Sequence, residues 1–179
     1  MTSEARIAIE PVGTAPFEIG PHNCFACGTL NRDGLGLTMH IGERRSWVDL
    51  ALDHRFVGWD GIAHGGIVAT ILDEVMAWAL VAEDNWGLTA RLSVEFKAPV
   101  RIGQAIRAEG WITRSRKRIV DTEARVVDAA DGTLLATATG VYVAADAARK
   151  RELAARYGVR RQQPAVEMAD APELVDAIR

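Results

Sequence analysis

The sequence predicts an α+β fold in which an antiparallel sheet of about five or six strands wraps around one long central helix. Three observations support this prediction. A predominantly apolar helical segment runs from about Gly66 to Ala82. Segments that alternate apolar and polar residues lie on both sides of it, two before and about four after. A single helix between two runs of strands favours a sheet that packs against that helix.

The composition is that of a globular protein with one main domain. The chain has 179 residues, of which 49% are hydrophobic and 25% charged. A net charge of -3 argues against a general nucleic-acid binder, which usually has a basic surface. The first residues show no signal peptide, and two acids interrupt the longest apolar segment. We therefore expect a cytoplasmic protein with no membrane or nucleic-acid partner.

The strands are expected in an antiparallel series. Segments 35–42 and 45–52 alternate on either side of Gly42-Glu43, which is typical of a β-hairpin. A loop is expected over 53–63, before the helix. Asp131-Gly132 predicts a tight turn late in the chain. The strands after the helix are expected at 88–100, 104–119, 120–130 and 133–145.

We divide the chain into three parts. Residues 1–33 form an N-terminal arm that contains a Cys-x-x-Cys-Gly segment. Residues 34–145 form the main domain. Residues 146–179 are expected to form a polar surface helix and a flexible tail, because their apolar residues are poorly patterned.

Several motifs give the main domain a family resemblance. "GIAHGGIVATILDE" is followed by "LTARLSVEFKAPVRIGQAIRAEGWI", by a basic turn and by "DGTLLATATGVYV". In this order they resemble the hotdog-fold acyl-CoA thioesterases, in particular the PaaI-like branch of the phenylacetate pathway. The upstream "CFACGTLNRDGLGL" resembles the leader of one branch of that group. The resemblance covers about residues 34–145 and implies a dimer as the minimal unit.

The first motif contains groups suited to thioester hydrolysis. The reaction needs a polariser for the thioester carbonyl and a base or nucleophile that starts the attack. Free N–H groups at a helix N-terminus polarise a carbonyl, and Gly65 and Gly66 allow it to approach the backbone closely. A carboxylate on an apolar helix can supply the base, and the resemblance assigns this role to Asp73.

The spacing of these residues predicts a homodimer. Gly65 and Asp73 are eight positions apart, which is about 12 Å along a helix axis. One carbonyl cannot contact both within one chain. We therefore expect two antiparallel helices across a two-fold axis, with active sites at the interface, and the resemblance implies the same arrangement. A dimer of dimers is left open.

Neighbouring residues are expected to have other roles. Glu74 points about 100° away from Asp73 around the helix, so we expect it to face a polar neighbour or the dimer interface. His64 is expected beside the substrate, with backbone hydrogen bonds that fix the glycine loop; a general base or metal ligand is the alternative. Thr89 either positions the attacking water, as a Ser or Thr does in relatives, or is an ordinary strand residue.

One departure from the family pattern concerns the loop before the helix. Relatives commonly have Asn or Gln where this chain has Gly58, and Asp60 or His54 could substitute only if the loop shifts. This departure favours an alternative function, a hotdog protein that binds acyl-CoA without hydrolysing it. A hydratase or dehydratase on the same fold is a further alternative.

The remaining candidates concern the substrate and a metal. Trp59 could form a wall of the acyl pocket, and the cluster "TRSRKR" could bind the CoA phosphates. Its arginines are Arg114, Arg116 and Arg118, with Arg116 preferred. We predict no cofactor and no metal.

The spacing of Cys24 and Cys27 is half that of a zinc site, but the chain has no further cysteine. We interpret the two as structural, partly buried thiols. Zinc, with help from His22 or His40 or shared between two chains, stays open, as does a redox pair.

Overall fold

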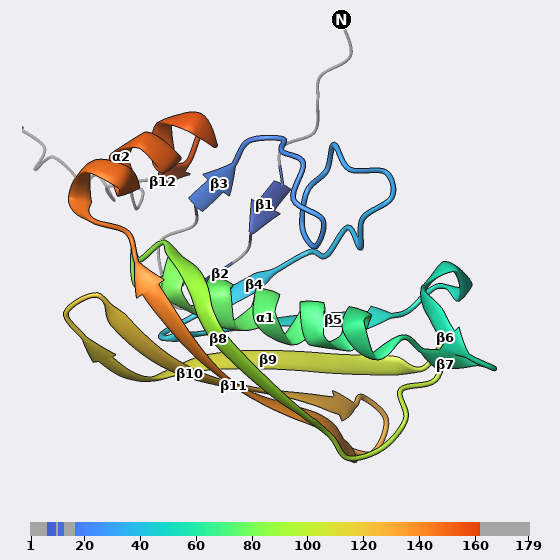
Figure 1. Ribbon diagram of the computed structural model, residues 1–179. Helices are drawn as coiled ribbons and strands as arrows, with labels where there is room; N and C mark the ends of the chain where they lie inside the picture. Colours follow the sequence, from blue (N-terminus) through green and yellow to red (C-terminus); the bar gives the residue numbers. More distant parts are fainter. Residues whose placement is uncertain (1–6, 10, 13–16, 162–179) are drawn as a thin grey trace, which may run out of the picture.

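The computed structural model describes residues 7–9, 11–12 and 17–161, and its centre is a sheet wrapped around one long helix (Figure 1). This confirms the predicted fold class. The sheet has the order β2-β4-β5-β9-β10-β11-β8, antiparallel throughout except that β2 is parallel to β4 at one edge. Its strands are β2 (Pro11–Val12), β4 (His40–Gly42), β5 (Arg45–Ala51), β8 (Gly87–Phe96), β9 (Ala105–Arg116), β10 (Ile119–Asp128) and β11 (Leu134–Ala144).

The central helix α1 spans Gly65–Ala82 and contributes eight buried residues to the core. It is long and apolar enough to cross a membrane by length and composition, yet it packs into the concave face of the sheet. A buried stripe follows the helical period, which makes α1 the centre of the hydrophobic core. The stripe consists of Val68, Ile71, Leu72, Val75, Met76, Ala79 and Leu80.

Helix and sheet approach most closely at Gly110 of β9. A Cβ placed there would lie 2.5 Å from the carbonyl carbon of Val75, so no side chain fits between the two backbones. Ser46 of β5 donates to the Val75 carbonyl oxygen at 2.5 Å. These two contacts fix the position of α1 on the sheet.

The turns explain the strand boundaries. Gly132, with φ of 77°, closes the β10–β11 hairpin and confirms the predicted turn. Lys117, with φ of 53°, closes the β9–β10 hairpin. A register shift between Asp121 and Thr122 places a bulge beside that turn.

Two predictions about local structure were wrong. The strand expected over 35–42 is only β4 (His40–Gly42), because the N–H groups of Leu35 and Leu37 donate instead to the Cys-x-x-Cys loop, at Phe25 O and Ala26 O. The loop expected over 53–63 contains a 3-10 turn, η1 (His54–Phe56), and a small hairpin of β6 (Val57–Trp59) and β7 (Ile62–Ala63).

The arm and the C-terminal segment lie together over one end of α1 (Figure 1). Strands β1 (Ile7–Ile9), β3 (Phe17–Ile19) and β12 (Arg160–Arg161) form a separate three-stranded sheet, which the arm was not predicted to contain. The predicted polar helix is α2 (Ala147–Arg156), capped by the Asp146 side chain. The predicted flexible tail lies outside the described residues.

Candidate functional site

Asp73 lies on α1 beside strands β8 and β11, half-buried, where two hydroxyl groups hold one of its oxygens. Thr89 of β8 donates to Oδ1 at 2.9 Å, and Tyr142 of β11 donates to the same atom at 2.7 Å. Within the described part of the chain, Oδ2 has no hydrogen-bond partner. The carboxylate is therefore oriented through one oxygen while the other is free to take a proton or to attack.

Tyr142 is a site residue that the sequence analysis missed. Its ring is fully buried, and its hydroxyl also donates to the Asp73 carbonyl at 3.0 Å. Burial and the charge of Asp73 raise the pKa of this hydroxyl, which keeps it protonated as a donor. A buried tyrosine needs a hydrogen-bond partner, and that requirement was the signal available in the sequence.

The N-terminus of α1 supplies one free donor rather than two. His64 is the N-cap, and its Nδ1 accepts the Gly66 N–H at 3.0 Å. The expected backbone hydrogen bond of His64 is thus present, and the expectation that the Gly66 N–H is available is corrected. The Gly65 N–H has no partner among the described residues. Gly65, Gly66 and His64 are all exposed.

Strand β8 runs past both ends of this arrangement. It is an edge strand whose one neighbour in the described sheet is β11, and its outer side is exposed. Leu88, next to Thr89, is 80% exposed, and Phe96, which packs against Gly65, is 56% exposed. A long edge with large exposed apolar residues is a surface that another chain normally covers.

Gly58 cannot be replaced by a side chain without movement. A Cβ there would lie 2.8 Å from the Cα of His64, because β6 and β7 pair closely at this point. The space that Asn or Gln would need is filled by the backbone that carries the helix cap. His54 and Asp60, the possible substitutes, are exposed.

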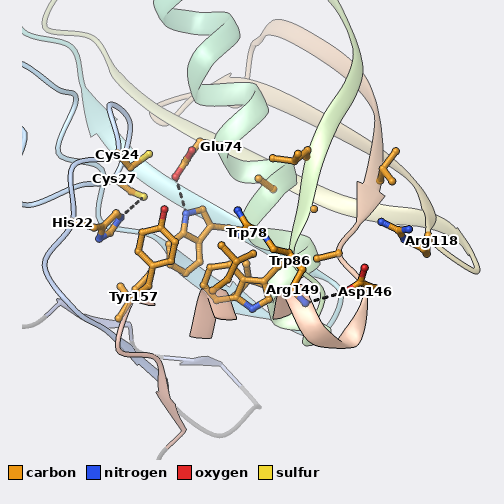
Figure 2. A pocket seen from close by; sticks show the side chains of 18 residues that line it. His22, Cys24, Cys27, Glu74, Trp78, Trp86, Arg118, Asp146, Arg149 and Tyr157 are labelled. Carbon is orange, nitrogen blue, oxygen red and sulfur yellow. Dashed lines mark hydrogen bonds between the residues drawn. The ribbon is translucent and has the colours of Figure 1, made fainter. Parts of the chain in front are cut away.

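A cavity of about 400 Å³ lies on the other side of α1, where Glu74 rather than Asp73 faces it (Figure 2). One end is formed by His22, Cys24, Cys27 and Glu74, and the other by Arg118, Asp146 and Arg149. Three aromatic side chains line the middle, Trp78, Trp86 and Tyr157.

The structure separates the predicted substrate-binding residues. Arg118 reaches the cavity and donates to the Ala144 carbonyl at 2.8 Å. Arg116 lies 4.0 Å from Asp121, exposed, and Arg114 is exposed as well. Trp59 is 84% exposed at the tip of the β6–β7 hairpin and contributes to no described cavity. Its expected role as a wall of the acyl pocket has no support within one chain and stays a prediction.

Glu74 has a different environment from its neighbour. Its Oε1 accepts from Trp78 Nε1 at 2.8 Å, and burial together with Cys24 raises its pKa to about 7. Hydrogen bonds from the Cys27 thiol and from backbone N–H groups lower the pKa of Cys24 to about 5. The bond to Cys24 and burial raise the pKa of Cys27. The predicted polar neighbour of Glu74 is thus the cysteine pair.

The architecture defines the class of protein. A long helix wrapped by an antiparallel sheet, with a carboxylate on the helix beside an exposed edge strand, is the hotdog fold. Solved structures show the same fold. E. coli PaaI, from the phenylacetic acid degradation operon, has a TM-score of 0.59 and 16% identity, covering 63% of this chain and 81% of PaaI. The Streptococcus mutans protein smu.793, bound to acetyl CoA, has a TM-score of 0.57 and 17% identity, covering 60% of this chain and 86% of smu.793.

Sequence comparison finds similarity to the same group of proteins. Residues 60–135 match the model of the thioesterase superfamily. Acyl-coenzyme A thioesterase THEM4 of Xenopus laevis is 25% identical over 118 residues, 64% of this chain and 53% of the relative. The chain thus spans about half the length of that curated relative. The chain has the hotdog fold, and residues 60–135 are similar to the thioesterase superfamily, as the motifs indicated.

Proposed function

We propose that the chain is an acyl-CoA thioesterase that hydrolyses an acyl- or aryl-CoA to the free acid and CoA. The observation that carries this proposal is the Asp73 carboxylate, held through Oδ1 by Thr89 and Tyr142 with Oδ2 free. The amphibian relative is an acyl-CoA thioesterase, and the streptococcal structure contains acetyl CoA, which supports the choice of substrate.

The chemistry follows from two positions on α1, its N-terminus and its middle. In one route, Asp73 Oδ2 takes a proton from a water molecule while the oxygen of that water attacks the thioester carbon. In the other route, Asp73 Oδ2 attacks the thioester carbon itself and forms an anhydride, which water then hydrolyses. The Gly65 N–H stabilises the carbonyl oxygen as it becomes negative. The C–S bond then breaks, and the CoA sulfur leaves as a thiolate that is protonated by solvent.

Two chains complete each site in this proposal. Gly65 and Asp73 are separated along α1 by about 12 Å, too far for one carbonyl. The exposed edge of β8 carries Thr89 and runs close to Gly65 at Phe96, so a partner chain that pairs there would bring its own helix start near Asp73. The homodimer, with a possible dimer of dimers, therefore forms across β8.

The proposal assigns the substrate to the surfaces on both sides of β8. The arginines near the β9–β10 turn, Arg114, Arg116 and Arg118, bind the CoA phosphates, which suit guanidinium groups. His64 remains beside the carbonyl as the cap that shapes the glycine loop. The protein acts in the cytoplasm and needs no nucleic acid or membrane.

The test is thiol release from a panel of aryl- and aliphatic acyl-CoAs. Asp73→Asn should lower kcat by about 10²–10⁴-fold, the usual contribution of a positioned base. Asp49→Asn is the matched control, because this carboxylate is exposed on the outer face of the sheet and paired with Arg107. A reaction without substrate gives the background from Cys24 and Cys27. Equal rates for wild type and Asp73→Asn would refute the assignment.

A second function is favoured by one observation. The backbone of His64 fills the place of the family's Asn or Gln beside Gly58, which removes one group that could hold the substrate or water. An acyl-CoA-binding protein without turnover would show binding in calorimetry and no thiol release by the wild type with any substrate of the panel.

A further inference from the structure

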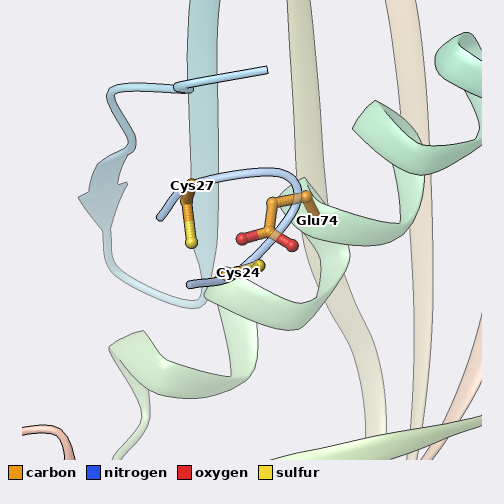
Figure 3. A group of neighbouring side chains, drawn as sticks. All are labelled: Cys24, Cys27 and Glu74. Atoms are coloured by element: carbon orange, nitrogen blue, oxygen red, sulfur yellow. The ribbon is translucent and has the colours of Figure 1, made fainter. Parts of the chain in front are cut away.

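A cluster of metal-ligating side chains closes one end of the cavity and has no part in the proposed hydrolysis (Figure 3). The sulfur atoms of Cys24 and Cys27 and a carboxylate oxygen of Glu74 all lie within 4.8 Å of one another. Zinc binds sulfur at about 2.3 Å and carboxylate oxygen at about 2.0 Å, so its ligand atoms in a tetrahedron are about 3.5 Å apart. Small side-chain rotations would bring these three atoms to that spacing.

The loop that carries the cysteines is shaped by its backbone. A Cβ on Gly28 would lie 2.4 Å from Cys24 N and 2.5 Å from Cys24 O, so only glycine permits this turn. The Gly28 N–H donates to Cys24 O at 3.0 Å, and the N–H groups of Ala26 and Cys27 act on the Cys24 sulfur and favour its thiolate form. Such N–H donors stabilise a thiolate, the form of cysteine that binds metals.

His22 lies beside the Cys27 sulfur, outside the group of three, and is the candidate for a fourth donor after a rotation of its side chain. Its Nδ1 lies 3.0 Å from the carbonyl oxygen of Gly20, which can only accept, so Nδ1 carries the proton. The lone pair is then on Nε2, which lies 3.4 Å from the Cys27 sulfur. A histidine that binds a metal through one nitrogen typically donates its other N–H to a carbonyl in this way.

Glu74 gives the cluster a reason to hold a cation. The residue is half-buried at the end of the cavity, and the groups that act on its carboxylate are the two cysteines, Trp78 and Asp73, none of which is a cation. A carboxylate removed from water costs free energy unless it is paired or coordinates a metal. Two thiolates and a carboxylate together are negatively charged, and a divalent ion would offset that charge.

We propose that Cys24, Cys27, Glu74 and His22 bind one divalent metal ion of the zinc class. Sulfur, nitrogen and one carboxylate in a four-ligand set favour zinc over magnesium or calcium, which prefer oxygen. The ion connects the N-terminal loop to the middle of α1 and lies at the end wall of the cavity. The cavity is its path of entry.

A disulfide between Cys24 and Cys27 is the competing use of the same atoms. It would satisfy the two sulfurs but would leave the Glu74 carboxylate buried without a cation. Because the cluster also contains the Glu74 carboxylate and the His22 imidazole, it favours a metal site over a redox pair of cysteines.

The test uses the intact wild-type protein, so it does not depend on a variant that folds. The metal content is measured after purification without chelator, and the protein is then stripped under reducing conditions and titrated with Co²⁺. We expect saturation at one Co²⁺ per chain, a thiolate-to-cobalt charge-transfer band in the near ultraviolet and tetrahedral d–d bands. Zn²⁺ should displace Co²⁺ and raise the Tm. The proposal would be overturned if Co²⁺ does not bind stoichiometrically, or if mass spectrometry finds a Cys24–Cys27 disulfide in the protein as purified.

Variants then identify the ligands independently of thiol release. Cys24→Ser and Cys27→Ser should each weaken the charge-transfer band, and Glu74→Gln should reduce the affinity for Co²⁺ by at least tenfold with its two thiols intact. Asp73→Asn is the matched control, because it neutralises the adjacent carboxylate on the other side of α1 and should bind Co²⁺ as the wild type does. An unchanged affinity in Glu74→Gln would overturn the assignment of Glu74.

Discussion

Two adjacent carboxylates on α1 differ in almost every respect except position. Asp73 is held by hydroxyl groups from β8 and β11 beside an exposed edge, whereas Glu74 is buried among sulfur atoms at the end of a cavity. A rotation of about 100° around one helix separates the two environments. The difference teaches that a single apolar helix can serve two sites if each acid is supplied with partners from a different part of the chain.

The largest expected effect is on kcat and tests the Gly65 N–H, the donor that stabilises the thioester carbonyl opposite Asp73. Gly65→Pro removes the one free N–H at the helix start, and proline is tolerated at the first helical position. The residue before it, His64, already has a compatible ψ of 130°. We expect kcat in the thiol-release assay to fall by about 10²–10³-fold, the usual cost of one carbonyl-polarising donor. Co²⁺ binding at the Glu74 side should not change.

Gly65→Ala is the control for this variant. It adds a Cβ at 3.4 Å from the Phe96 ring but retains the N–H, and its kcat should stay close to that of the wild type. Mixing Gly65→Pro with Asp73→Asn subunits under exchange should restore about a quarter of the wild-type activity, since half of the dimers would contain one intact composite site. No recovery despite exchange of subunits would contradict a site built from two chains.

The second prediction concerns the pH dependence of the Glu74 side in the metal-free protein. Its folded pKa of about 7 lies above the model-peptide value of 4.5, so the folded state binds the extra proton between these values. The stability that this proton provides is full below about pH 4.5 and is lost as the pH rises through about 7. Its loss lowers the free energy of unfolding by about 3 kcal/mol.

Urea unfolding with a chelator at about pH 5 and about pH 8 measures this term. The Cys24 thiol titrates in the opposite sense, because its pKa is lowered to about 5, so the difference between wild type and Glu74→Gln is the quantity to compare. The Asp73→Asn protein should keep most of the wild-type pH dependence, because the charge of Asp73 is the smallest of the effects that raise the pKa of Glu74. If the difference in unfolding free energy between wild type and Glu74→Gln does not vary with pH, the pKa of Glu74 is not raised in the folded protein.

The smallest expected effect sharpens the description of the Asp73 side. Tyr142→Phe keeps the buried ring and removes one of the two hydroxyl groups on Oδ1, so kcat should fall about tenfold. Thr89→Val should act similarly, whereas Thr89→Ser retains a hydroxyl and should act weakly. If kcat for Tyr142→Phe equals that of the wild type, this tyrosine does not position the carboxylate.

The motif and its periodicity predicted most of the fold and part of the site. They placed Asp73 on the central helix and Thr89 at the start of the next strand, and the structure joins the two at 2.9 Å. Tyr142 was missed because its contact with Asp73 spans 69 positions and leaves no local pattern. The capture of the Gly66 N–H by His64 depends on a side-chain orientation, which spacing does not specify.

The sulfur cluster could not be assembled from the sequence for a related reason. Cys-x-x-Cys-Gly alone gives half a zinc site, and the other ligands come from a helix about fifty positions later and from a histidine whose direction is set by the Gly20 carbonyl. The signal that was available was Glu74 itself, a second acid on a helix face that the apolar pattern assigns to the interior. Gly58 likewise read as a missing side chain, whereas the structure shows a close backbone contact.

The contact between Gly110 and the backbone of Val75 sets the rotational phase of α1. A helix turned by one residue about its axis would bring Glu74 to the direction that Asp73 now has, against the hydroxyl groups, and would turn Asp73 away from both sites. Gly110 and Ser46 contact the backbone of Val75, in the turn that follows these acids. The sheet therefore fixes the directions of both carboxylates at once. A methyl group on Gly110 would therefore displace α1 and disturb the geometry of two sites on different faces of the helix, although it would contact neither site.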